Sequence, residues 1–63
     1  MKYAIKKGNK YFTKKGGWSK DIFKADLVDY KTACNEIKDY PNLFKNCKPV
    51  PIKETYTREE VKE

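Results

Sequence analysis

The alternation of apolar and polar residues predicts a β-hairpin at the start of the chain. Two runs of β-favouring residues, 2–6 and 10–14, flank the dipeptide Gly8-Asn9, which is typical of the two-residue loops that join hairpin strands. Because opposed residues share a sheet face, one face of this hairpin carries Tyr3, Ile5 and Phe12. We expect the opposite face to be a cationic surface with one aromatic side chain, formed by Lys2, Lys6, Tyr11, Thr13 and Lys15.

A third strand is predicted after the hairpin. Gly16 and Gly17 end the second strand, and residues 18–21 are predicted to form a turn in which Trp18 folds back over the core. From residue 22 to residue 28 apolar and charged residues alternate, with one side formed by Phe23, Ala25 and Leu27. This period of two residues indicates a strand.

One helix is predicted next. Asp29 is a candidate N-cap, and the following apolar residues have the i, i+3, i+4, i+7 spacing of a helix face: Tyr30, Ala33, Cys34 and Ile37. The residue before a proline avoids the helical conformation, so we expect the helix to end near Tyr40, before Pro41.

The C-terminal third is predicted to contribute little to the sheet. Pro49 and Pro51 lack the N–H donors that a central strand needs, so any pairing of residues 48–52 would lie at an edge. Thr57 and Glu60 match a capping box, but the remaining residues are too few for a helix to hold without packing. We therefore expect a charged, frayed tail over residues 54–63.

Together these elements predict an α+β fold. The N-terminal hairpin and the third strand form a small antiparallel sheet, one α-helix packs on it, and a Pro-rich edge segment lies at the C-terminus. A chain of 63 residues allows one domain, which we place at residues 1–53, and nine aromatic residues can fill its core.

The charge of the chain is concentrated in its first third. The net charge is +6, and residues 1–24 alone hold eight lysines and one acidic residue, Asp21. Such an asymmetry bears on binding partners and encounter rates rather than on the fold. No apolar run has the length of a signal peptide or of a membrane span, so we expect a cytoplasmic protein that does not bind a membrane.

The residue types that usually carry catalysis are scarce. The chain has no histidine, and its one serine, Ser19, lacks the glycine pattern of a nucleophile elbow. Cys34 and Cys47 lack the spacing and the partners of a zinc site; they are reduced thiols in the cytosol or one disulfide in an oxidising compartment. We expect a protein that binds a macromolecule, with no catalytic residues, no cofactor and no metal site.

The basic hairpin and the turn after it are the candidate binding surface. Ammonium groups along phosphates and an aromatic ring on a base are a typical arrangement in β-sheet proteins that bind nucleic acids. The single arginine, Arg58, argues against sequence-specific readout. The alternatives stay open at this stage: the lysines also suit a solvated face, and Trp18 suits either the core or an interface. The candidate residues are Lys2, Lys6, Lys10, Tyr11, Lys14, Lys15, Trp18 and Lys20.

The order of these signals over residues 2–52 resembles small uncharacterised proteins from phages and prophages of Gram-positive bacteria. The resemblance is carried by Tyr3-x-Ile5-Lys6, Lys10-Tyr11-Phe12, Gly17-Trp18-Ser19, Ala25-x-Leu27, Ala33 in the helix, and Pro49-Val50. It implies an accessory protein that binds and disables a host system, as anti-CRISPR proteins do. Many anti-CRISPR proteins are acidic DNA mimics, whereas a basic one would cover an acidic surface, contact RNA or DNA held by its target, or hold an effector in an inactive state.

Two hypotheses follow from the sequence. The first is a non-enzymatic inhibitor of a host protein or ribonucleoprotein complex, such as a CRISPR nuclease or another defence complex, acting in the host cytoplasm. The second is a module that binds DNA or RNA directly through the basic hairpin. A homodimer would suit so small a core in either case.

Overall fold

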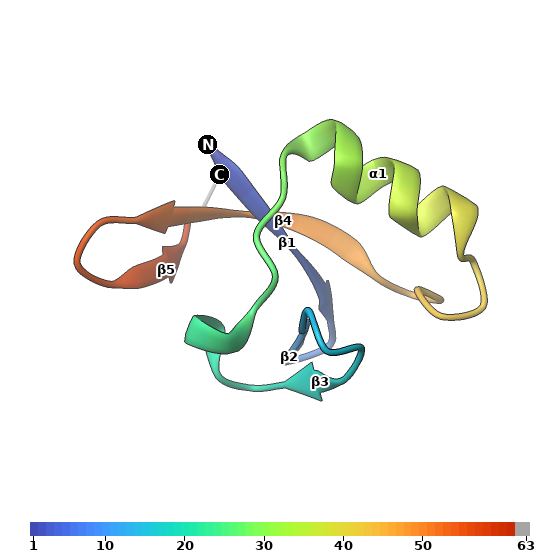
Figure 1. The fold of residues 1–63 in the computed structure, drawn as a ribbon, viewed down its shortest axis with the longest axis horizontal. Helices are drawn as coiled ribbons and strands as arrows, with labels where there is room; N and C mark the ends of the chain where they lie inside the picture. The colour runs from blue at the N-terminus through green and yellow to red at the C-terminus, as the bar shows by residue number, and fades with distance from the viewer. Residues whose placement is uncertain (62–63) are drawn as a thin grey trace.

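The computed structural model describes residues 1–61, which form a curled antiparallel sheet of five strands and one α-helix (Figure 1). The strands are β1 (Lys2–Lys7), β2 (Lys10–Phe12), β3 (Trp18–Ser19), β4 (Lys48–Glu54) and β5 (Arg58–Glu60), and their order in the sheet is β3-β2-β1-β4-β5. The helix is α1 (Tyr30–Asp39), and a short 3₁₀ helix, η1 (Ile22–Lys24), follows β3. The predicted α+β class is confirmed, but the sheet is larger than predicted.

The N-terminal hairpin has the predicted register. Lys7 pairs with Lys10, and Lys6 pairs with Tyr11. Gly8 has a φ of 61°, the left-handed conformation that the first central residue of a tight hairpin turn requires.

The predicted third strand over residues 22–28 is wrong. Residues 22–24 form η1, because the Asp21 carboxylate accepts a hydrogen bond from the Phe23 N–H at 2.9 Å. This bond caps a helical turn, so the segment does not form the hydrogen bonds of a β-strand. Only single bridges remain in this segment, from Ala25 to Thr13 and from Val28 to Tyr3. The strand next to β2 is instead β3, in the segment that the sequence predicts as a turn.

The Pro-rich segment is not at the edge of the sheet, as predicted, but forms β4 between β1 and β5. Tyr3 of β1 lies opposite Pro51 of β4, but its N–H and C=O form hydrogen bonds with Val28. The ladder between β1 and β4 therefore needs no N–H donor from Pro51. The Pro51 carbonyl accepts a hydrogen bond from the Val61 N–H on the β5 side. Because Pro49 and Pro51 are two residues apart, both missing donors lie on this same side, where β5 pairs only with residues 52–54.

Residues 58–60 of the predicted frayed tail form β5. The Arg58 guanidinium donates hydrogen bonds to the carbonyl oxygens of Ile22, Phe23 and Ala25, at 3.3, 3.1 and 3.1 Å. These bonds tie β5 to η1 across more than 30 residues of sequence, which no local pattern encodes. Residues 62 and 63, which belong to the same predicted tail, lie outside the described residues.

The helix begins and ends where the sequence predicts. Asp29 is the N-cap, and its carboxylate accepts a hydrogen bond from the Thr32 N–H at 2.7 Å. This bond holds the pKa of Asp29 below its ordinary value. No helix within residues 1–61 is long and apolar enough to cross a membrane.

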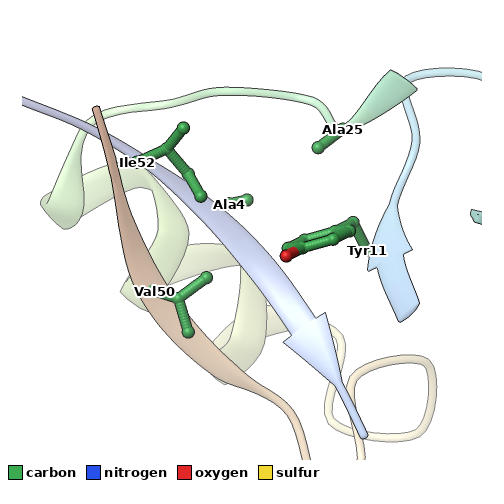
Figure 2. Close-up of a cluster of buried hydrophobic side chains, with 5 residues drawn as sticks. All are labelled: Ala4, Tyr11, Ala25, Val50 and Ile52. Atoms are coloured by element: carbon green, nitrogen blue, oxygen red, sulfur yellow. The ribbon is translucent and has the colours of Figure 1, made fainter. Parts of the chain in front are cut away.

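Both faces of β1 are buried. Ala4 belongs to one apolar cluster with Tyr11, Ala25, Val50 and Ile52, which lie inside the curl of the sheet (Figure 2). Ile5, next in sequence, belongs to a second cluster beneath α1, where Ala33 of the helix and Phe44 of the following loop are buried. In Figure 1 the helix lies on one side of β1 and β4, with β2, β3 and η1 on the other.

We expect the substitution Arg58→Ala to destabilise the domain by about 1–3 kcal/mol, because it leaves three carbonyl oxygens without their charged donor. The measurement is the free energy of unfolding from urea titration followed by tryptophan fluorescence. Lys53→Ala is the matched control. The Lys53 side chain is exposed on β4, so a change in the free energy of unfolding within about 0.5 kcal/mol is expected. Equal stability of the two variants would mean that the bonds from Arg58 to the three carbonyl oxygens do not stabilise the fold.

Candidate functional site

The structure separates the eight residues that the sequence groups as one binding surface. Tyr11 is the clearest correction, because only 6% of its surface is exposed and its ring lies in the cluster inside the curl (Figure 2). The sequence predicts it on a solvated face because the hairpin alone has two faces, of which the helix covers one. The curl of the full sheet covers the second face as well, so the Tyr11 ring is not available to stack on a base.

Lys6 is held by an internal contact. Its Nζ lies 2.7 Å from Oε2 of Glu60 and 5.4 Å from the centre of the Tyr11 ring. The Tyr11 hydroxyl donates a hydrogen bond to the same carboxylate oxygen at 2.8 Å. The bond from Lys6 lowers the pKa of Glu60, whereas burial and then the bond to Glu60 raise the pKa of Tyr11 to about 12. This network joins β5 to the hairpin and removes Lys6 from the set of free cations.

Trp18 packs on the core, which is one of the two alternatives that its sequence context allows. Its ring meets those of Phe12 and Phe44 edge-to-face, with centroids 5.6 and 6.2 Å apart. Lys7 Nζ lies 5.7 Å from the centre of the indole. The indole is half-buried and closes one end of the cluster beneath α1.

The other candidate lysines are exposed but do not all lie together. Lys2 lines a depression at the start of β1, with Met1 and residues 52–54. Lys10 begins β2 and Lys20 follows β3, and both side chains are exposed. Lys14 and Lys15 lie together in the loop between β2 and β3, and they form the core of the site described next.

The loop Thr13–Gly17 is closed by its own hydrogen bonds. The Thr13 N–H donates to the Gly17 carbonyl at 2.9 Å, and the Gly16 N–H donates to the Thr13 carbonyl at 2.9 Å. The Thr13 hydroxyl donates to the Gly17 carbonyl and accepts from the Gly17 N–H. Gly16 has a φ of 88°, which a residue with a side chain rarely adopts. The loop is therefore fixed, and it presents Lys14 and Lys15 to solvent at its tip.

A third lysine completes this group. Thr13 pairs with Ala25 in an antiparallel bridge, so the residue after Thr13 lies beside the residue before Ala25. Lys24, the last residue of η1, thus lies beside the loop tip. An open depression of about 360 Å³ is lined by Thr13, Lys14, Lys15 and Lys24, which we call the lysine cluster.

The lysine cluster is suited to binding an anion. Within residues 1–61 none of its three ammonium groups is in a salt bridge, and its lining contains no acidic residue. Like charges held close together repel each other, and an anionic partner relieves this repulsion. Thr13 also lines the depression, and its hydroxyl is already engaged in two hydrogen bonds with Gly17. The sequence identifies Lys14 and Lys15 but misses Lys24, because it predicts Lys24 within a strand.

Comparisons of this chain with protein-family models, with curated proteins and with solved structures find no match. Within residues 1–61, no three histidine, cysteine, aspartate or glutamate side chains are grouped to hold a metal ion.

The Glu60 network gives a testable dependence of stability on pH. The pKa of Glu60 is lower in the folded chain than its ordinary value of 4.5, so its stabilising contribution is fully present above that value. The contribution is lost as the pH falls through the folded pKa. We therefore expect the wild type to exceed Glu60→Gln in urea midpoint at pH 7, and this difference to shrink below about pH 4.5.

The matched control for this prediction is Glu59→Gln, which changes the net charge by the same amount on the same strand but removes no side-chain contact within residues 1–61. We expect it to alter the midpoint less than Glu60→Gln does at pH 7. If the urea midpoint of Glu60→Gln equalled that of the wild type at every pH, the Glu60 network would not stabilise the fold.

Proposed function

We propose that this chain is a non-enzymatic accessory protein that binds and inhibits a host complex containing nucleic acid. The lysine cluster carries the proposal, because its three ammonium groups, which make no salt bridge within residues 1–61, stand on a hydrogen-bonded loop and an adjoining turn and suit the phosphates of a nucleic acid backbone. The structure leaves the cluster exposed, whereas two lysines of β1 make internal contacts: Lys6 with Glu60, and Lys7 with Trp18.

The mode of contact follows from the residue types. Lysine binds phosphate as a point charge and lacks the rigid fork with which arginine reads guanine, and the buried Tyr11 offers no ring for stacking. The expected contact is therefore with the backbone and independent of sequence. In an inhibitor this contact supplies attraction to the nucleic acid that the target already holds. A CRISPR ribonucleoprotein is the particular target that the resemblance to phage proteins supports.

A second candidate function uses the same surface. The chain would bind free RNA or DNA directly, without a protein target. The lysine cluster favours this candidate equally, since phosphates are the same in both settings, and only the partner recovered from the host distinguishes them.

We expect the triple substitution Lys14→Gln, Lys15→Gln, Lys24→Gln to weaken binding to a labelled RNA or duplex DNA by roughly tenfold or more at moderate salt. The slope of the logarithm of affinity against the logarithm of salt concentration should fall by about three, one for each lysine lost. Fluorescence anisotropy from about 50 to 200 mM salt measures both quantities.

The matched control is Lys31→Gln, Lys38→Gln, Lys45→Gln, which removes the same charge from exposed positions on α1 and the loop after it. An equal loss of affinity in both variants would show that net charge alone drives binding and would contradict the site.

In the host, a tagged chain should recover one stoichiometric complex that contains nucleic acid. Recovery of free nucleic acid alone would support the second candidate.

A further inference from the structure

A recess of a different character lies at the end of β2, where Phe12 is one of its lining residues. It has a volume of about 130 Å³ and is lined by Phe12, Glu36, Tyr40, Leu43 and Phe44. This corresponds to roughly four water molecules, a size that suits the end of one side chain and is below that of a typical small-molecule pocket. Four of its five lining residues are apolar or aromatic, and the fifth is an acid.

Glu36 is the unusual member of this lining. Its Oε2 atom is buried, and within residues 1–61 it has no hydrogen-bond partner. A buried polar atom without a partner costs free energy, more so when it carries charge, and it is uncommon in folded proteins. Glu36 lies on α1 one turn before Tyr40, so the carboxylate and the phenol ring belong to the same end of the helix.

The rim of the recess is also unusual. Tyr40 is 60% exposed and Leu43 is 44% exposed, although both are large and have apolar surface to bury. Aromatic residues around a small pocket are typical of interface positions that accept a side chain from a partner.

We propose that this recess binds an arginine side chain presented by a partner protein. The guanidinium is planar, is weakly hydrated, stacks on aromatic rings and pairs with carboxylates, so it suits a recess lined by three aromatic side chains and one acidic side chain. Lysine satisfies the carboxylate but not the flat aromatic walls. An anionic ligand is excluded, because it would meet the Glu36 carboxylate. This proposal does not rest on the lysine cluster.

The probe for the test is N-acetyl-L-arginine methylamide, titrated into the ¹⁵N-labelled full chain and followed by NMR. N-acetyl-L-citrulline methylamide, which has nearly the same shape but no charge, is the ligand control. We expect the arginine probe to shift the amide signals of residues 36–44 with an affinity in the millimolar range, and the citrulline probe to bind roughly tenfold more weakly. Equal shifts with both probes, or shifts confined to other residues, would overturn the proposal.

Protein variants complete the test. Glu36→Gln should weaken binding of the arginine probe roughly tenfold. Its melting temperature should equal or exceed that of the wild type, since the change neutralises a carboxyl group whose buried Oε2 atom has no hydrogen-bond partner within residues 1–61. Asp39→Asn, an exposed carboxylate on the same helix, is the matched control and should bind as the wild type does. Unchanged binding by Glu36→Gln would refute the site.

Two more variants separate this proposal from fold effects and from the proposed function. Tyr40→Ala removes an exposed ring and should weaken the arginine probe with little change in melting temperature. The triple substitution of Lys14, Lys15 and Lys24 by glutamine should leave arginine binding intact. Loss of arginine binding in that variant would mean that the recess is not an independent site.

Discussion

The burial of both faces of β1 is the constraint on which the rest of the structure depends. Ala4 and Ile5 are consecutive, point to opposite faces of the strand, and are each almost fully buried, in different apolar clusters. A chain of 63 residues can cover both faces only if the sheet curls over one and the helix packs on the other. The curl in turn needs β4 and β5 on one edge of β1, and η1 against β5. Lys14 and Lys15 lie beyond the end of β2, outside the curl, and remain exposed.

Local signals account for the parts of the fold that the sequence predicts. The Gly8-Asn9 loop and the Asp29 cap each act within a few residues, so the hairpin register and the helix bounds follow from them. The remainder depends on partners far away in sequence. The alternation of residues 22–28 is that of a strand, yet Asp21 and Arg58 together hold the first part of it as a turn. A pattern of apolar residues carries no information about such contacts.

The same distinction separates the predicted site from the observed one. The sequence predicts lysines on one face of a hairpin by assuming that this face meets solvent. The curl of the sheet contradicts that assumption for Tyr11 and pairs Lys6 with Glu60, 54 residues away. Lys14 and Lys15 remain exposed because they lie in a loop, where no sheet face decides exposure. Lys24 joins them only through the bridge between Thr13 and Ala25, and the Glu36 recess forms only where helix, loop and strand meet.

The two proposed sites adjoin each other through consecutive residues. Phe12 lines the recess of Glu36, whereas Thr13 lines the lysine cluster, so a cation site and an anion site flank the end of β2. A protein that holds RNA or DNA presents the same two chemistries side by side, with arginines at the edge of its nucleic acid channel and phosphates within it. A chain of net charge +6 would be repelled by a basic protein alone, but phosphates bound beside the arginine offset that repulsion. Occupation of both sites would therefore select a nucleoprotein over either free component, because each contact raises the effective concentration of the other.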